Sequence, residues 1–386
     1  MPVLPERTEN PAPRWGEFRR RMPVARRWAY LDHAAVAPLS GPAADLLAEW
    51  SGEAARDGAT PYRQWMERLE ATRRTAARLI GAEPAEVALV RNTTEGIGLV
   101  AEGFPWEPGD NVVLRDDEFP SNVYPWMNLA DRGVETRRVP TDRGRLNLDR
   151  LAAACDERTR IIALSWVAYS NGWRHDVGRL ARLAHDHGAL LFLDAIQALG
   201  VFPLDVKQTG VDFLSADGHK WLLGPEGAGV FFTRHEHLGR LRPLGVGWNS
   251  VVHCHDFDRI ELALKPAAER YEGGSPNTAG FLALGESLNL LAEYGFTAIA
   301  ERVLWLTDLA CVKLEGLGAT VLSDRSGEHR SGIVSFELPG RDPKQVQADC
   351  LKRDVVLSCR SGRLRISPHA YNDQRDIERL VDAIGQ

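Results

Sequence analysis

The sequence predicts an α/β fold with a large domain built on a mostly parallel sheet, followed by a smaller α+β C-terminal domain. Two observations predict it. From residue 87 to about residue 232, short apolar runs alternate with amphipathic segments, which is typical of parallel strands joined by helices. Around Gly273 the pattern changes to two long helices, and only later do strands return. We therefore expect residues 1–280 to form an N-terminal segment and the large domain, and 281–386 the small domain.

The elements of the large domain follow from local spacing and turn signals. A short strand at Tyr30 runs into a turn of small residues. Trp65 and Leu69 begin a helical repeat of apolar residues, and Gly81 ends that helix. We expect helices over 61–80, from about 94, and over 121–130, 147–155 and 176–187, and strands over 87–90, 111–114, 134–139, 161–165, 189–193 and 228–232.

The C-terminal part has longer periodic segments. Apolar residues recur at helical spacing after residue 280, and short β-branched runs follow. We expect helices over 281–294, 298–317 and 343–352 and from Asp373, and strands over 319–322, 333–338, 355–357 and 364–367.

The overall composition excludes several classes of protein. The 386 residues are 44% hydrophobic and 26% charged, as in ordinary soluble domains. A net charge of −6 provides no basic field for nucleic acid or an anionic membrane. No apolar run approaches the roughly 20 residues of a membrane helix, and the five scattered cysteines argue against a disulfide framework. We expect a cytoplasmic protein without nucleic-acid or membrane partners.

Lys220 is the first candidate for chemistry. It lies between two apolar stretches, after Gly218 and His219 and before the glycine-rich turn 224–227. Burial disfavours the charged form of an amine, and a neutral amine is what imine chemistry requires. The alternative is an ordinary surface lysine in a turn.

Two further stretches follow predicted strands. Thr93 and Thr94 stand at a predicted helix N-terminus, where free N–H groups and hydroxyls suit a phosphate, although such residues also cap many helices. Asp194 ends an apolar strand, where a carboxylate needs a cationic partner such as a protonated ring nitrogen, unless it caps the next helix. Together with Lys220 on one sheet edge, these features describe a pyridoxal 5'-phosphate (PLP) site.

The chain also resembles a known family over nearly its whole length. It is similar to the class V aminotransferase group of PLP-dependent transferases of fold type I, which includes cysteine desulfurases and isopenicillin N epimerase-like proteins. The matching stretches are 30–35 (YLDHAA), 93–96 (TTEG), 194–197 (DAIQ), 217–221 (DGHKW), 272–277 (EGGSPN) and 364–372 (LRISPHAYN).

The resemblance implies roles for the cofactor-binding residues. Lys220 would be the Schiff-base lysine and proton shuttle, and Asp194 would pair with the pyridinium nitrogen. Gln197 would hydrogen-bond the ring hydroxyl. The phosphate would be held by Thr93, Thr94 and His219.

The resemblance also implies a substrate and a partner. Arg365 would grip the carboxylate of a small amino-acid or amine substrate through its bidentate fork, and Arg360 is a second candidate. Gly274 and Ser275 would reach the phosphate of the partner protomer, which implies a homodimer with shared active sites.

Three departures separate the chain from desulfurases. Phe119 stands where desulfurases have a histidine that stacks on the cofactor ring, so it can stack but cannot transfer a proton. Tyr169 stands where they have an asparagine. Cys359 is separated from Arg365 by only five residues, without the longer loop that carries the nucleophilic cysteine of desulfurases.

These observations favour a PLP enzyme acting on an amino acid or related amine, with aminotransferase or epimerase-like activity. The alternative is a cysteine desulfurase or selenocysteine lyase-type C–S lyase. A non-catalytic PLP-fold regulatory protein would usually lack Lys220 or Asp194, and both are present.

Two stretches carry residue types that also bind metals. Neither the stretch 235–237 (His-Glu-His) nor 253–255 (His-Cys-His) has a second ligand cluster at a recognised spacing. We expect both to be solvated loops and the protein to have no metal site.

Overall fold

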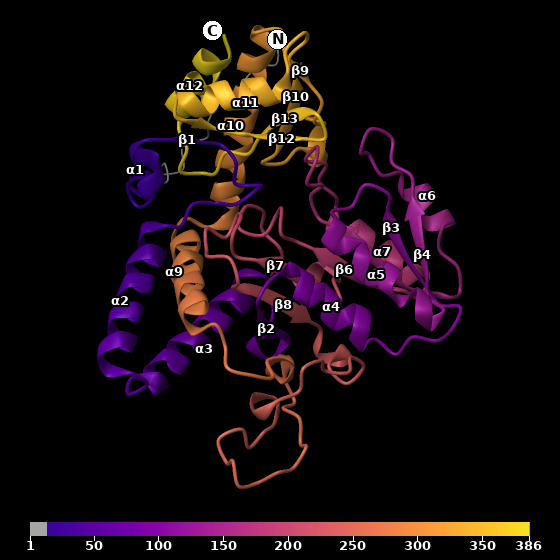
Figure 1. The fold of residues 1–386 in the computed structure, drawn as a ribbon. Helices are drawn as coiled ribbons and strands as arrows, with labels where there is room; N and C mark the ends of the chain where they lie inside the picture. The colour runs from indigo at the N-terminus through magenta and orange to yellow at the C-terminus, as the bar shows by residue number, and fades with distance from the viewer. Residues whose placement is uncertain (1–13, 386) are drawn as a thin grey trace.

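A seven-stranded sheet forms the centre of the larger part of the molecule (Figure 1). The structure, a computed structural model, describes residues 14–385. The strand order is β2-β8-β7-β6-β5-β3-β4, and β8 runs antiparallel to both neighbours while the remaining pairs are parallel. The predicted mostly parallel sheet is therefore confirmed. The strands are β2 (Val87–Val90), β3 (Asn111–Arg115), β4 (Glu135–Val139), β5 (Thr159–Ser165), β6 (Leu190–Asp194), β7 (Phe213–Asp217) and β8 (Gly229–Thr233).

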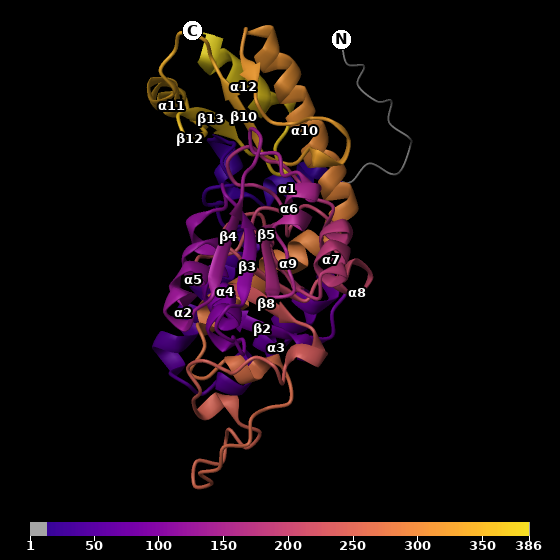
Figure 2. The same ribbon diagram turned by 90° about the vertical axis from the view of Figure 1, so that its right-hand side faces the viewer.

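Helices cover both faces of this sheet, and Figure 2 shows α5 and α7 on opposite sides of it. Side chains alternate along a strand, so Leu191 and Leu193 of β6 enter the core shared with α3, α7 and α9, whereas Phe192 enters the core shared with α4 and α5. The helices of this part are α2 (Gly41–Asp57), α3 (Tyr62–Leu79), α4 (Thr93–Gly103), α5 (Tyr124–Met127), α6 (Leu148–Ala153), α7 (Val177–Asp186), α8 (Val206–Thr209) and α9 (Thr278–Tyr294).

The smaller part contains an antiparallel sheet with the order β12-β13-β10-β9. Segments far apart in the sequence meet here, because β1 pairs in parallel with β11, next to the small sheet. Its elements are β1 (Ala29–Tyr30), α10 (Phe296–Gly316), β9 (Thr320–Val321), β10 (Val334–Glu337), α11 (Pro343–Lys352), β11 (Val355–Val356), β12 (Ser358–Arg360), β13 (Arg363–Ile366) and α12 (Gln374–Gly385). Helix α1 (Trp15–Arg20) lies nearby, with Phe18 in the large-sheet core.

The domain boundary near residue 280 stays a prediction. Helix α9 packs on α2 and α3 and shares their core. Along α10 the core changes, since Val303 belongs to the large-sheet core and Leu306 to the small-sheet core.

The structure contains helices that the sequence did not predict, namely α1, α2 and α8, and it breaks one predicted helix. Helix α2 was not predicted, although Ala43, Leu46 and Trp50 recur at helical spacing and pack in or against the large-sheet core. The single helix expected over 121–130 is broken into a short α-helical turn at Tyr124–Met127 with 3₁₀ turns on either side. Pro120 and Pro125 lack the N–H that a continuous helix needs.

Within residues 14–385, none of the helices combines the length and apolar character needed to cross a lipid bilayer. The cytoplasmic location expected from the sequence stays a prediction.

Gly96 allows α4 to pack tightly on the sheet, and this packing is testable. A Cβ at Gly96 would lie 2.7 Å from the Ser215 Cβ and 3.2 Å from Phe231 Cδ2. We expect Gly96→Ala to lower the free energy of unfolding by about 1–3 kcal/mol through overpacking. The matched control is Gly52→Ala in α2, where a Cβ meets nothing within 4 Å. This substitution should stabilise the helix by roughly 0.5–1 kcal/mol. Urea unfolding would measure both, and equal effects would contradict the packing argument.

Candidate active site

Most of the predicted site residues meet in one pocket of about 230 Å³ at the carboxyl edge of the large sheet. Helix α4 begins just after β2, Asp194 ends β6 and Lys220 follows β7, so three neighbouring segments supply it. The predicted residues that line the pocket are Thr93, Thr94, Phe119, Asp194, Gln197, His219, Lys220, Arg360 and Arg365.

Lys220 and Asp194 are both buried, with exposed fractions of 8% and 2%. Burial lowers the pKa of Lys220 to about 8, although the nearby Asp194 carboxylate opposes this shift. Burial also raises the pKa of Asp194 to about 7, opposed by the Ile196 N–H, which donates to Oδ1 at 3.1 Å. The amine is therefore easily neutralised, and the carboxyl group would be stabilised by a cationic ring nitrogen.

The start of α4 is tied to the end of β7. The Asn92 side chain caps the helix by accepting from the Glu95 N–H at 2.9 Å, and Thr93 Oγ1 accepts from the Asp217 N–H at 2.9 Å. His219 Nδ1 lies 2.8 Å from Asp217 Oδ2. Unpaired N–H groups at a helix start suit a phosphate. Asp217 is a site residue without a predicted role, although it stands in the sequence motif that contains Lys220.

Gly274 and Ser275 do not line this pocket. Both are exposed and line a separate groove of about 920 Å³. Asn92 and Thr94 line both cavities, so the groove lies against the outer side of the predicted phosphate site. In a single chain these two residues are therefore apart from the other predicted site residues.

Arg365 is held in a buried network that the sequence did not reveal. Its side chain is 1% exposed. Nη1 donates to the Tyr169 carbonyl at 2.7 Å, Nε donates to Ser358 Oγ at 3.2 Å, and Nη2 lies 3.4 Å from Asp32 Oδ1. Burial lowers the pKa of Arg365, and Asp32 opposes this shift. Arg360 is exposed at the same pocket, where Nη1 donates to the Cys359 carbonyl at 3.3 Å.

Cys359 lies on the other face of the same hairpin. In the β12–β13 pairing, Ser358 is opposite Arg365 and Cys359 is opposite Leu364. Because side chains alternate along strands, Cys359 shares a face with Leu364, which is buried in the small-sheet core, and not with Arg365. Among the described residues, no cysteine lines the pocket.

Phe119 is placed to contact a ring in the pocket. It is 40% exposed, and its centroid lies 5.5 Å from Lys220 Nζ and 5.2 Å from the Tyr169 ring. The adjacent Glu118 is buried and accepts from the Ser165 N–H at 2.8 Å, which fixes the loop to the end of β5. Burial raises the pKa of Glu118.

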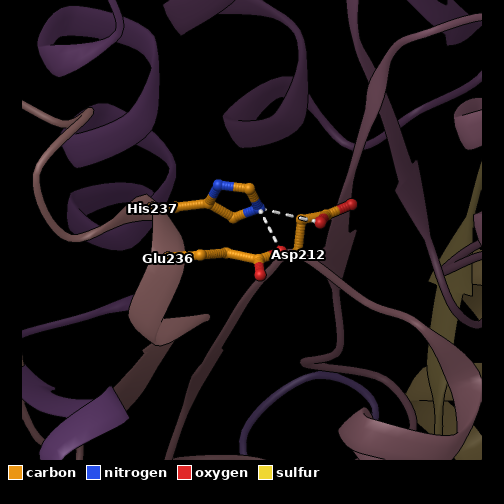
Figure 3. Close-up of side chains that lie close together, drawn as sticks. All are labelled: Asp212, Glu236 and His237. Atoms are coloured by element: carbon orange, nitrogen blue, oxygen red, sulfur yellow. Dashed lines mark hydrogen bonds and ion pairs between the residues drawn. The ribbon is translucent and has the colours of Figure 1, made fainter.

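The expectation of a solvated loop at 235–237 is wrong for His237, which is 7% exposed. Figure 3 shows it beside Glu236 and the buried Asp212, just before β7. Asp212 accepts from the Leu191 N–H at 2.9 Å, and its two oxygens lie 2.9 Å from His237 Nε2 and 2.8 Å from His185 Nε2. These contacts satisfy the carboxylate without an ion, and the absence of a metal site stays a prediction.

Comparison with known proteins identifies the family. The family model described as aminotransferase class-V matches residues 29–380. The chain belongs to the class V aminotransferase family.

Several proteins that are similar to this chain, in sequence or in solved structure, are desulfurases. A probable cysteine desulfurase of Methanothermobacter thermautotrophicus is 31% identical over 95% of this chain and 96% of its own, and a cysteine desulfurase of Shigella flexneri is 34% identical over 92% of each. The apo cysteine desulfurase of Thermococcus onnurineus has a TM-score of 0.88 at 25% identity, covering 96% of this chain and 97% of its own. A C-DES variant with glycine covalently linked to PLP has the same fold, with a TM-score of 0.89 at 20% identity, over 95% and 98% of the two chains.

Class V enzymes depend on PLP, so the predicted cofactor and the fold type I architecture are confirmed. The residues present fit this cofactor. A buried amine, a buried carboxyl group of raised pKa and a helix N-terminus converge on one pocket. The roles expected for the individual residues stay predictions.

The lowered pKa of Lys220 predicts how the apoprotein takes up PLP. Only the neutral amine attacks the aldehyde, so the rate should rise about tenfold from pH 6 to pH 7 and level off above about pH 8. An ordinary lysine, with a pKa of about 10.4, would show a rate that still rises at pH 10. The growth of visible absorbance after mixing measures the rate, and Lys220→Ala should give no such band. A rate that keeps rising to pH 10 would contradict the burial effect.

Proposed function

We propose that the protein is a PLP-dependent C–S lyase of the desulfurase type that acts on cysteine or a related sulfur-containing amino acid. The named relatives are cysteine desulfurases, and they favour this function over the aminotransferase or epimerase-like activity that the sequence suggested first. Lys220 and Asp194 line one pocket, which argues against a non-catalytic protein.

Each residue of the pocket has a separate role in the proposed reaction. PLP, when bound, supplies an electron sink for negative charge at the substrate α-carbon. Asp194 holds a proton on the cofactor ring nitrogen. Because burial lowers its pKa to about 8, the Lys220 amine loses its proton more easily than an ordinary lysine and can then remove the α-proton. Arg365 is fixed by Tyr169 and Ser358, and its remaining N–H groups bind the substrate carboxylate.

The orientation of the Cys359 side chain indicates that sulfur is not transferred to this cysteine. A desulfurase passes sulfur to a cysteine thiol on a long loop. Here β12 and β13 are joined through Ser361 and Gly362, both at positive φ, and Cys359 faces away from the pocket. We therefore propose that the Cβ–S bond breaks with its electron pair on sulfur and that the sulfur leaves directly. Hydrolysis of the remaining carbon skeleton then gives pyruvate and ammonium.

Product analysis tests this function. With L-cysteine or L-cystine, we expect pyruvate and ammonium rather than alanine. Cys359→Ala should keep kcat within about twofold, because its side chain lies on the opposite face of the hairpin from Arg365. Arg365→Lys should lower kcat/KM by roughly 100-fold, since a lysine cannot reproduce the bidentate contact. Alanine formation that depends on Cys359 would contradict the proposal, as would amino transfer or racemisation as the main reaction.

We also propose that the active enzyme is a homodimer. Gly274 and Ser275 lie outside the pocket of their own chain but line an exposed groove that borders the predicted phosphate site. A second copy docked on this groove would bring its own Gly274 and Ser275 close to that phosphate.

Mixed dimers test the shared site. Lys220→Ala and Ser275→Glu should each be inactive, the second because its carboxylate repels the phosphate. Co-expression of the two should restore about a quarter of wild-type activity, because each mixed dimer keeps one intact site. Light scattering should give about twice the chain mass of 42.8 kDa. A mass of one chain, or no recovery of activity, would contradict a shared site.

A further inference from the structure

Gln197 is held by two buried partners that differ in chemistry. It lines the pocket and is 4% exposed. Its Oε1 accepts from the indole Nε1–H of Trp221 at 3.0 Å. Its Nε2 donates to the Ala34 carbonyl at 2.9 Å. Both partners come from segments far from Gln197 in the sequence.

These two partners determine the orientation of the Gln197 amide, with Oε1 toward Trp221 and Nε2 toward Ala34. An indole nitrogen can only donate and a carbonyl oxygen can only accept, so turning the Gln197 amide over would break both contacts. The Nε2 group has two N–H bonds, and Ala34 takes one of them. The other is left for a ligand in the pocket.

Trp221 itself is rigidly placed. It is 1% exposed and directly follows Lys220. Burial lowers the pKa of His369 to about 4, so this histidine is neutral at pH 7. Its Nδ1 accepts from the Ala370 N–H at 2.9 Å, so its Nε2 donates to the Trp221 carbonyl at 3.1 Å. At Gly332, a Cβ would lie 2.5 Å from the indole ring, which leaves no free space there.

We propose that Trp221 is a positioning residue for the cofactor: it locks the Gln197 amide with an N–H donor, and not the oxygen, directed at the ring hydroxyl of bound PLP. This proposal rests on the cofactor and on the place of Gln197 in the pocket, and it is independent of the lyase reaction. The negative charge on the hydroxyl oxygen is stabilised by such a donor and destabilised by an amide oxygen.

The visible absorbance of bound PLP reports this effect. The band changes with pH as the linkage between Lys220 and PLP loses its proton, and a donor on the ring oxygen favours the deprotonated form. Trp221→Phe keeps the aromatic bulk but removes the indole N–H. We expect it to raise the pH midpoint of the band by about one unit, a tenfold change in proton affinity.

A double-mutant cycle separates positioning from general damage. In a Gln197→Leu background, Trp221→Phe should cause no further shift of the midpoint, because there is no amide to orient. The matched control is Trp65→Phe. Trp65 is 6% exposed and donates to Glu53 Oε2 at 3.0 Å, but it does not line the pocket. It should lower the melting temperature without moving the midpoint.

Gln197→Glu keeps the test decisive if Trp221→Phe fails to fold. It leaves Trp221 in place but offers only acceptor oxygens to the ring, so the midpoint should rise by at least one unit. The proposal is overturned if Gln197→Glu leaves the midpoint unchanged. It is also overturned if Trp221→Phe does not move the midpoint, or moves it no further than Trp65→Phe does. A third contrary result would be a midpoint shift by Trp221→Phe that is as large in the Gln197→Leu background as in the wild-type background.

Discussion

The burial of an amine and a carboxyl group at one edge of the sheet is the constraint on which the site depends. Strands β6 and β7 are covered on both faces, so Asp194 and Lys220 lose most of their contact with water. Burial disfavours both charges, which shifts the two pKa values toward each other, to about 7 and about 8. A cofactor that brings an aldehyde and a basic ring nitrogen relieves both penalties at once.

The neighbouring residues are fixed by contacts between distant segments. Thr93 at the start of α4 accepts from the Asp217 N–H at the end of β7, which ties the phosphate end of the pocket to the strand that leads to Lys220. At the substrate end, Arg365 contacts Asp32 from the N-terminal segment and the carbonyl of Tyr169 from the large-sheet part. The side chains are therefore in place before a ligand arrives, which reduces the entropy lost on binding.

The sequence predicts the parts of the site that depend on local pattern. Lys220, Asp194 and Thr93 could be found because each follows a strand, and parallel strands end at the same edge. The pairing of Arg365 with Asp32 and the burial of His237 depend on tertiary packing between remote segments, which a local pattern does not contain. The direction of the Cys359 side chain depends on the register of a hairpin, where a slip of one residue reverses every face.

The parallel pair β1–β11 has a consequence for the order of events on the ribosome. Ala29 pairs with Val355, so β1 leaves the ribosome long before its partner. At about 5–20 residues per second, the wait is roughly 15 to 65 seconds. Arg365 also arrives late, and until then one wall of the pocket is missing. The charge of Arg365 also lowers the pKa of Lys220, so we expect the Lys220 amine to hold its proton more tightly until that part of the chain is made.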